Sequence, residues 1–502
     1  MMQWIDTFLD RITMYRLLLY VLIGLELAAF FLAVFGVLHF SPLDIAFSGA
    51  YLTAVCWIAN KVFGYVFDAP TNVESPLITA LILALIISPT HTTSGLLFLT
   101  AAGGLAIASK YVLAIRGKHI FNPAAIAVVM TSYGAGDAAS WWVGTAAMLP
   151  YVLVGGVLLI RRIRHTEMVL WFLGVSLAAT MLYGFIGGQN PFTLVNQEIL
   201  NSALFFVGFI MLTEPLTSPT TRGKRVWYST IVGLIFPPQF NILGTYIAPE
   251  VALIVGNVFT YIVGPRTKSF LEFKERIRIS RDSMDFIFTP KRPFTFKAGQ
   301  YMEFTFQHPH TDSRGARRYF TLASSPTEPQ VRIGLRFYQP GSSFKRELLK
   351  ITSQTPIVAG QLGGDFILPK DQQRKLVFIA GGIGITPFRS MLKYLVDTEQ
   401  QRDVTLIYSA RTSGDIVYQD VFNEARAKLG TKLHYFVGDP QAKDPFTNAR
   451  ITTASLQSLE LDKDSLFYIS GPHDMVVDTE KALHELGVPA LHIRKDFFSG
   501  YA

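Results

Sequence analysis

The stretch RRYFTLAS at residues 317–324 stands between two strand-like runs in the C-terminal third of the chain, and AGGIGITP follows at 380–387. An arginine fixed on a strand is suited to pair with a phosphate, because a guanidinium offers its donors in a rigid fork. A glycine turn that opens a helix is suited to the phosphates of a nucleotide, because the first N–H groups of the helix have no backbone partner. The two stretches together predict that a flavin and a nicotinamide nucleotide meet in this part of the chain.

Residues 270 to about 368 read as short alternating strands separated by proline and glycine, which predicts a small antiparallel barrel. The period changes after residue 374. There, KLVFIAGG predicts a buried strand, TPFRSMLKYLVDT an amphipathic helix and VTLIYSAR the next strand. Such alternation of strands and helices indicates a parallel, doubly wound α/β sheet. The expected barrel strands are ERIRISRD, MDFIFTP, GQYMEFTF, RRYFTLAS and VRIGLRFY.

The first half of the chain is much more apolar than the second. Of 502 residues, 50% are hydrophobic and only 16% are charged, and the apolar excess lies before about residue 265. We expect about ten membrane-spanning helices, several of them shorter than the ~20 residues of a perpendicular span, which indicates half-helices or tilted segments. The expected spans are residues 16–39, 44–66, 75–90, 93–115, 120–134, 141–160, 167–187, 198–212, 226–242 and 249–264.

Lysine and arginine indicate the orientation of this region, because cytoplasmic loops carry most of the positive charge. With the N-terminus inside, the fourteen Lys and Arg residues up to residue 268 flank or lie near cytoplasmic span ends. An even number of spans then returns the chain to the cytoplasm. We expect a multi-pass protein of the cell (inner) membrane, with both termini cytoplasmic. The net charge of +8 follows from this topology, so no nucleic-acid partner is expected.

Three domains are expected on this basis: a transmembrane domain at residues 1–267, a flavin-binding barrel at 268–368 and a nucleotide-binding α/β domain at 369–502. The fold class is therefore a polytopic helical membrane domain fused to a soluble barrel and an α/β domain.

Cysteine and histidine exclude several kinds of redox centre. Cys56 is the only cysteine, which excludes a disulfide or a cysteine-ligated iron–sulfur cluster within one chain. A bis-histidine haem needs pairs of rings that face each other from inside helices. The histidines of the apolar region fall instead at span ends or in loops, so a transmembrane ferric reductase is disfavoured and no metal site is expected. They are His39, His91, His119 and His165.

Residues 270–502 resemble the ferredoxin-NADP reductase superfamily, in which a flavin barrel precedes a nucleotide domain. Seven stretches carry the resemblance in the order of the family, which is far more specific than any single match. They are AGQY (298–301), RRYFTLAS (317–324), PGSSFKRELL (340–349), AGGIGITP (380–387), YSAR (408–411), SGPHDMV (470–476) and DFFSGY (496–501). The resemblance implies an FAD-dependent NAD(P)H oxidoreductase.

For the flavin, the resemblance implies that Arg318 pairs with the phosphate, that Phe320 lies against the isoalloxazine and that Thr321 reaches the reactive ring nitrogen. Phe320 replaces the usual Tyr, which keeps the stack and loses a hydrogen bond. Ser342 and Ser343 begin a helix and would offer hydroxyl and N–H groups to the pyrophosphate. The alternative is that they are ordinary helix caps and that the arginine is a surface residue. Tyr319 and Ser324 complete the flavin-binding set.

For the nucleotide, the glycines of AGGIGITP let the backbone approach the dinucleotide closely. Ser409 and Arg411 would hold a 2′-phosphate and favour NADPH; the alternative is that Arg411 packs against the adenine. Ser470 stands where the family often has Cys, which leaves no thiol for chemistry. The expected nucleotide-binding residues are Gly381, Gly382, Gly384, Thr386, Ser409, Arg411, Gly471, Pro472, Met475, Phe498 and Tyr501.

Phe498 and Tyr501 resemble the C-terminal aromatic residues that border the nicotinamide face of the flavin in this family, and ordinary C-terminal packing is the alternative. Hydride transfer needs stacked rings rather than an acid or a base, so the absence of a catalytic carboxylate is no objection. Thr321 and Phe498 are the expected catalytic positions.

Residues 40–265 resemble the D subunit of the Rnf electron-transport complex and the B subunit of the sodium-pumping NADH:quinone oxidoreductase. The resemblance rests on residues 72–89, 118–125 and 209–236, and it implies an electron conduit. These relatives carry FMN linked to Thr in a Ser-Gly-Ala-Thr motif. The corresponding loop, YGAGDAASWWVGT at 133–145, lacks the Gly-Ala-Thr. Any flavin here, FMN or riboflavin, is therefore expected to be noncovalent.

Polar breaks divide the apolar runs on both sides of the membrane. TEPLTSPTT at 213–221 and SPTHTT at 88–93 lie on opposite faces, as two inverted five-helix halves with broken helices would place them. Polar groups inside a membrane are costly unless buried, which favours a functional site near the midplane. The alternative is that these loops cap helices at the inner interface. The expected polar residues are Asn72, Glu74, Ser75, Thr79, Asn122, Thr213, Glu214 and Thr217.

The sequence thus predicts a transmembrane NAD(P)H oxidoreductase that passes electrons through FAD into the membrane, and on to an outer-side flavoprotein or to quinone. The partners are a nicotinamide nucleotide, membrane lipid and that acceptor. Two alternatives remain: a transporter of flavin or another small ligand with a fused reductase, or a soluble-type reductase that is merely anchored.

Overall fold

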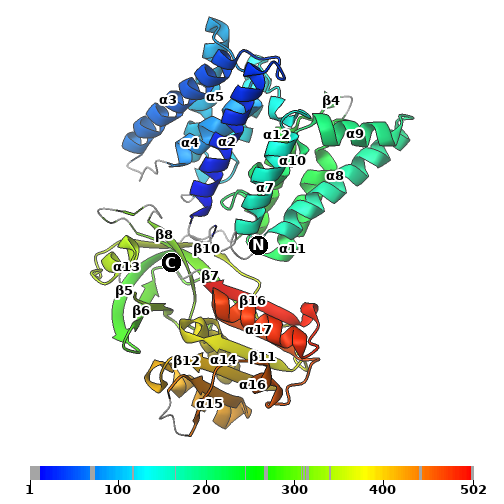
Figure 1. Ribbon diagram of the computed structural model, residues 1–502. Helices are drawn as coiled ribbons and strands as arrows, with labels where there is room; N and C mark the ends of the chain where they lie inside the picture. The colour runs from blue at the N-terminus through cyan, green and yellow to red at the C-terminus, as the bar shows by residue number, and fades with distance from the viewer. Residues whose placement is uncertain are drawn as a thin grey trace. The chain divides into compact units, whose positions relative to one another are not determined.

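The computed structural model describes residues 9, 12–67, 74–115, 118–163, 165–242, 245–264, 269–306, 308, 311–312, 316–338, 341–439 and 444–498. The chain divides into two compact units, Met1–Arg266 and Thr267–Ala502. The first unit is helical apart from two short hairpins, and the second contains two six-stranded sheets (Figure 1).

The helical unit is built from apolar helices joined by short loops. Its helices are α2 (Met14–Val34), α3 (Pro42–Val66), α4 (Glu74–Ile86), α5 (Thr93–Val112), α6 (Pro123–Ala135), the 3-10 turn η1 (Trp142–Gly144), α7 (Leu149–Ile163), α8 (Thr166–Ile186), α9 (Pro191–Asn201), α10 (Leu204–Phe206), the π-helix η2 (Val207–Met211), α11 (Arg222–Ile235) and α12 (Pro249–Val263). The hairpins pair β1 (Ala114–Ile115) with β2 (Lys118–His119) and β3 (Asn241–Ile242) with β4 (Thr245–Tyr246).

Fewer helices than expected are long enough to cross a membrane. Among the described residues, α2, α3, α5 and α8 meet the requirements of length and apolar character. A fifth candidate is α9 together with Leu204–Met211, two segments that meet at 61°. The helices α4, α6 and α12 are apolar but have only 10–17 residues. The expectation of about ten spans is therefore too high by this measure.

Fewer helices reach the length of a membrane span than expected, because parts of the apolar runs form loops and not helix. Helices α6 and α12 begin at Pro123 and Pro249, where the ring fixes the first helical turn and removes a donor that would have no helical partner. Helix α4 ends at Ile86, ahead of the SPTHTT break, and residues 137–141 after α6 form no helix. Each apolar run is thus shared between a short helix and a loop.

The first sheet of the Thr267–Ala502 unit is an antiparallel half-barrel in the order β8-β7-β10-β5-β6-β9. Its strands are β5 (Ser269–Arg278), β6 (Ser283–Pro290), β7 (Tyr301–Thr305), β8 (Arg317–Thr321), β9 (Val331–Arg336) and β10 (Ile357–Gly363). The N–H of Ala323, just beyond β8, donates to Arg332 O of β9 at 2.8 Å and draws the two edge strands together. The short helix α13 (Ser343–Leu348) precedes β10.

One strand of this sheet was not expected. Strand β10 lies between β7 and β5, far from its neighbours in sequence. Its residues IVAGQLG include two glycines, and its register against β7 shifts between Gly360 and Gly363. Glycine weakens the sequence pattern of a strand, and a bulge breaks its two-residue period, so the alternation that marks the other strands is absent here.

The second sheet is parallel throughout, as predicted, in the order β14-β13-β12-β11-β15-β16. Its strands are β11 (Leu376–Gly381), β12 (Val404–Ala410), β13 (Lys432–Val437), β14 (Phe446–Asn448), β15 (Leu466–Pro472) and β16 (Ile493–Phe498). The helices are α14 (Thr386–Asp397), α15 (Gln419–Leu429), α16 (Thr453–Gln457) and α17 (His473–Glu485).

Helices cover both faces of this sheet. Phe378 of β11 packs in one core with Phe388 of α14 and Phe422 of α15. The next residue, Ile379, belongs to a second core with Leu456 of α16 and Leu483 of α17. Successive residues of a strand point to opposite faces, so a strand buried on both sides reads as a continuous apolar run. This is why LVFIAG contains no alternation.

Candidate functional site

Strand β8 directs its residues alternately into the barrel and toward its surface. Phe320 is 5% exposed, and its ring lies 5.7 Å from that of Phe304 and 5.8 Å from that of Phe344. Tyr319 is 44% exposed and meets Tyr301 edge to face at 5.6 Å. The structure therefore places Phe320 in the aromatic core of the half-barrel and Tyr319 on its open side.

Arg318 and Ser343 converge on one carboxylate, that of Asp312. The Arg318 Nη2 atom lies 3.3 Å from Asp312 Oδ1, and the backbone N–H of Ser343 donates to Asp312 Oδ2 at 2.9 Å. The backbone N–H of Asp312 donates in turn to Ser343 Oγ at 2.9 Å, and His308 Nε2 lies 3.0 Å from the same oxygen. Arg318 and Ser343 are thus close enough to hold a single anionic group, which is the arrangement that a flavin phosphate requires.

Ser342 and Ser324 make contacts that belong to the fold. Ser342 caps α13, because its hydroxyl accepts from Lys345 N–H at 3.2 Å. The Ser324 hydroxyl accepts from Arg332 N–H at 3.1 Å, so it ties the end of β8 to β9. The capping alternative thus describes Ser342 well. Thr321 ends β8 and is 6% exposed.

The glycine turn after β11 brings two strand ends into close contact. A Cβ atom at Gly384 would lie 2.5 Å from the backbone oxygen of Ser470, and one at Gly381 would collide with Met475 Sδ. Gly382 has a φ of +53°, a region that side chains disfavour. Only glycine therefore permits this approach, and Thr386 then begins α14.

The expected nucleotide residues gather at the carboxyl edge of the parallel sheet, where ligands bind in folds of this kind. Ser409 of β12 is the register partner of Gly381, and Phe498 of β16 is the register partner of Pro472. Arg411 follows β12 and is exposed. The side chain of Phe498 and the whole of Tyr501 lie outside the described residues.

The buried hydroxyl of Ser470 is the feature of this edge that best fits a bound ligand. Its side chain is fully buried, and its Oγ has no hydrogen-bond partner among the residues that the structure describes. A buried hydroxyl without a partner costs free energy, which a ligand donor or acceptor would offset. With Gly381, Gly384 and Gly471 around it, the edge fits a nicotinamide nucleotide.

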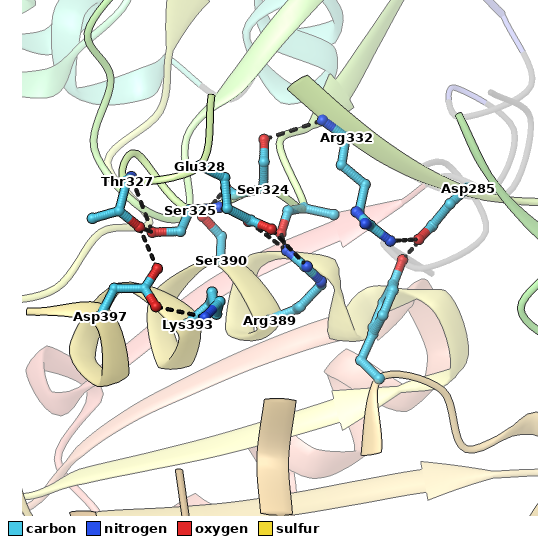
Figure 2. A network of polar contacts seen from close by, with 12 residues as sticks. Asp285, Ser324, Ser325, Thr327, Glu328, Arg332, Arg389, Ser390, Lys393 and Asp397 are labelled. Atoms are coloured by element: carbon cyan, nitrogen blue, oxygen red, sulfur yellow. Dashed lines mark hydrogen bonds and ion pairs between the residues drawn. The ribbon is translucent and has the colours of Figure 1, made fainter. Parts of the chain in front are cut away.

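A buried polar network joins the barrel to the parallel sheet, and the sequence reasoning missed it. Asp285 of β6 is fully buried, accepts from Tyr418 Oη at 2.5 Å and pairs with Arg332 Nη1 at 2.7 Å (Figure 2). Burial raises the pKa of Asp285 and raises the pKa of Tyr418 well above its ordinary value. The available signal was the aspartate inside MDFIFTP, a charged residue in a strand that is otherwise apolar.

In the helical unit, Glu214 is the centre of a polar cluster. Its Oε2 accepts from Asn122 Nδ2 at 2.9 Å and from Thr217 Oγ1 at 3.1 Å, and its Oε1 lies 3.7 Å from His119 Nε2. Asn257 of α12 accepts from the backbone N–H of Asn122 at 2.8 Å. The cluster thus draws on α6, on the segment after η2 and on α12.

Lys110 of α5 brings a half-buried cation to the same region. Its Nζ donates to Ser75 O at 3.2 Å, to Ser75 Oγ at 2.8 Å and to Thr79 Oγ1 at 2.8 Å. It also lies near enough to Glu214 for the two charges to attract. Lys110 was not among the expected residues, although it is a lone charge inside an apolar run, which is itself a signal of function.

Five of the expected membrane residues therefore come together, namely Ser75, Thr79, Asn122, Glu214 and Thr217. Two others make contacts elsewhere. Thr213 donates to Phe209 O of η2 at 2.8 Å, and Glu74 pairs with Arg16 Nε at 3.1 Å. Asn72 lies outside the described residues.

Comparison with known proteins identifies the second unit. The model of the oxidoreductase NAD-binding domain family matches residues 378–481. Oxidoreductase NAD-binding domain-containing protein 1 of Xenopus laevis is 30% identical over 224 residues, which are 39% of this chain and 68% of that protein. A flavohemoprotein of Candida albicans is 24% identical over 395 residues, 68% of this chain and 96% of that protein.

Among solved structures, the flavohem-like FAD/NAD-binding domain of nitric oxide dioxygenase from Vibrio cholerae is 22% identical, with a TM-score of 0.41, and the match covers 46% of this chain and 98% of that one. The family model covers the glycine turn and the parallel sheet from within β11 into α17. Through its Thr267–Ala502 unit the chain belongs to the FAD- and NAD-binding reductases of the ferredoxin-NADP reductase superfamily, and the protein is an FAD-dependent NAD(P)H oxidoreductase.

Proposed function

We propose that this protein takes electrons from NAD(P)H on the cytoplasmic side, passes them into its helical unit and delivers them to an outer-side flavoprotein or to quinone. The observation that carries the proposal is the polar cluster in which half-buried Lys110 and Glu214 meet the buried residues Thr79, Asn122 and Thr217. Charged groups inside apolar helices are costly and are retained where they serve an ion or electron pathway. An anchor for a soluble reductase would need no such cluster.

Bound FAD supplies the chemistry that the route needs, since it takes two electrons as hydride and releases them singly. Arg318 and Ser343 would hold its phosphate, as their shared contact with Asp312 suggests. The turn from Gly381 to Thr386 and the strand end at Ser470 would hold the nicotinamide nucleotide. Arg411 and Ser409 would favour NADPH over NADH.

A redox cofactor inside the helical unit is part of the proposal. Roughly 30 Å of hydrocarbon separates the two faces of a membrane, which is too far for direct electron transfer from FAD to an outer acceptor. We assign this role to a noncovalent flavin, FMN or riboflavin. Ser75, Thr79, Asn122 and Thr217 are the residues that would contact it. The support for noncovalent binding is the loop at residues 133–145, which lacks the Gly-Ala-Thr.

The localisation proposed is the cell (inner) membrane, with several spans and with both termini cytoplasmic. Its support is the distribution of lysine and arginine in the first 268 residues, together with the four long apolar helices.

The flavin content of full-length protein purified in detergent tests this proposal. We expect FAD and a second flavin, both released by acid, and we expect the second to be reduced after the first when NADPH is added without oxygen. A single extractable FAD with no other chromophore would exclude a redox cofactor in the helical unit and favour an anchored reductase. A flavin that remains covalently attached within residues 1–267 would exclude noncovalent binding. Counterflow of labelled flavin in liposomes, without electron transfer, would indicate a transporter.

A further inference from the structure

Arg389 links the helix that follows the glycine turn to the segment that follows strand β8. Helix α14 begins at Thr386, so Arg389 lies within its first turn. The Arg389 Nη1 atom donates to Ala323 O at 2.6 Å, two residues beyond the end of β8 (Figure 2). The side chain is only 5% exposed, so the contact is shielded from water.

The guanidinium also makes a two-point contact with Glu328. Its Nη1 and Nη2 atoms lie 2.8 Å and 3.0 Å from the two carboxylate oxygens (Figure 2). Burial favours protonation of Glu328, but the hydrogen bond and charge of Arg389 outweigh it, so the pKa of Glu328 is lowered. Glu328 accepts in addition from Ser325 N–H at 2.6 Å, so it closes the turn that begins at Ser325. A planar fork suits this contact better than the single ammonium of lysine.

The neighbouring residue, Ser390, makes a second link to the same segment. Its hydroxyl donates to Ser324 O at 2.6 Å (Figure 2). Arg389 and Ser390 are neighbours on α14, and they donate to the carbonyl groups of Ala323 and Ser324, respectively. The segment 323–328 is in turn bound to β9, because Arg332 N–H donates to Ser324 Oγ.

We propose that Arg389 is a positioning residue for hydride transfer, because it sets the separation between the end of β8 and the glycine turn. The inference rests on placing FAD at β8 and the nicotinamide nucleotide at the turn. Hydride transfer depends steeply on the distance between the two rings, and a displacement of about 1 Å can cost on the order of a hundredfold in rate. Arg389 contacts neither ring. It acts through Ala323 and Glu328.

The test compares Arg389→Ala and Arg389→Lys with wild type, all as full-length protein in detergent. Lys428→Ala is the matched control, because Lys428 is a cation on the neighbouring helix α15 that pairs with Glu424 at the surface. The measurements are FAD per chain, the dissociation constant of the nucleotide, and the rate constant of flavin reduction at saturating NADPH. The charge-transfer absorbance between nicotinamide and flavin, and hydrogen–deuterium exchange of residues 322–328, report position directly.

We expect Arg389→Ala to retain FAD and to bind NADPH within about threefold of wild type, while flavin reduction slows by roughly 10- to 100-fold. The charge-transfer band should weaken, and residues 322–328 should exchange faster. Arg389→Lys should recover part of the rate, and Lys428→Ala should match wild type. A wild-type rate constant in Arg389→Ala, or an equal loss in Lys428→Ala, would overturn the inference.

Two milder variants decide the question if Arg389→Ala does not fold. Glu328→Gln removes the charge that orients the guanidinium, and Ser390→Ala removes one of the two links to residues 323–324. Slower flavin reduction with full FAD content in either variant supports the inference, and wild-type rates in both refute it. These measurements need only NADPH and FAD, so they remain decisive if no electrons reach the helical unit.

Discussion

The hydroxyl of Tyr418 lies 2.5 Å from the carboxylate of Asp285, although 133 residues separate them in the chain. Tyr418 precedes helix α15 with a φ of +62°, and Asp285 lies in the half-barrel. Between them is Gly334 of β9, the register partner of Asp285. Because Gly334 has no side chain, the Tyr418 hydroxyl passes over β9 and reaches the buried carboxylate of Asp285. This contact joins the two halves of the reductase unit.

Tyr418→Phe is expected to destabilise the reductase unit by about 1–3 kcal/mol, because it leaves one oxygen of buried Asp285 without its donor. Gly334→Ala should cost more, since its Cβ would collide with the Tyr418 hydroxyl. In the Tyr418→Phe background the cost of Gly334→Ala should shrink, because the colliding atom is gone. The temperature of FAD release, followed by flavin fluorescence, measures all three. Additive costs would contradict the contact.

The stability of this unit is expected to depend on pH through Asp285. Burial raises its pKa above the ordinary value of 3.8, and the bonds from Tyr418 and Arg332 only partly oppose this. The folded state therefore binds the proton more tightly than the unfolded state. The stabilisation is complete below the ordinary pKa and is lost as pH rises through the raised pKa.

Asp285→Asn stays neutral and should remove that part of the pH dependence. The measurement is the difference in FAD-release temperature between wild type and variant from about pH 4 to about pH 7. We expect wild type to lose stability relative to the variant as pH rises. A constant difference over this range would mean that Asp285 does not titrate there.

Arg318→Ala is expected to weaken FAD binding by roughly 2–5 kcal/mol, because it leaves the phosphate of FAD buried without its cationic partner. Arg317→Ala is the control, since Arg317 lies on the same strand, its side chain is 50% exposed and its Glu303 partner is 3.9 Å away. The measurement is FAD per chain after purification, followed by titration of the apoprotein. Full FAD content in Arg318→Ala would rule out the assignment.

Arg411→Ala is expected to raise the Michaelis constant for NADPH about tenfold, equivalent to about 1.4 kcal/mol, and to leave that for NADH nearly unchanged. The reason is that only NADPH carries the 2′-phosphate. Lys432→Ala is the control, because Lys432 begins β13 and lies at the opposite edge of the sheet. Equal losses with both nucleotides would mean that Arg411 serves the adenine or the fold.

Lys110→Met is expected to slow electron delivery beyond FAD by at least about tenfold, because the half-buried carboxylate of Glu214 would lose its opposite charge. Flavin reduction by NADPH should be unchanged. Lys61→Met is the control, since Lys61 is exposed and lies 5.9 Å over the ring of Trp57. Quinone reduction in proteoliposomes and ferricyanide reduction at the soluble face separate the two steps. Equal quinone rates in both variants would remove Lys110 from the route.

The sequence alone was sufficient for the parallel character of the second sheet, for five of the six barrel strands and for the glycine turn. Each of these depends on a local property: a run such as LVFIAG buried on both faces, a two-residue alternation such as that of VRIGLR, or a backbone turn that only glycine permits. Local periodicity failed where the backbone is irregular. Bulged β10 was missed, and apolar runs that divide between helix and loop were counted as whole spans.

Only the tertiary structure decided which buried polar groups meet. Lys110 and Glu214, Arg389 and Ala323, and Tyr418 and Asp285 come from distant parts of the chain. No sequence period relates such pairs, because a buried charge or hydroxyl takes its partner from whatever element packs against it. Packing also assigned Phe320 to the barrel core and Ser342 to a helix cap, whereas the sequence allowed a role at the flavin for each.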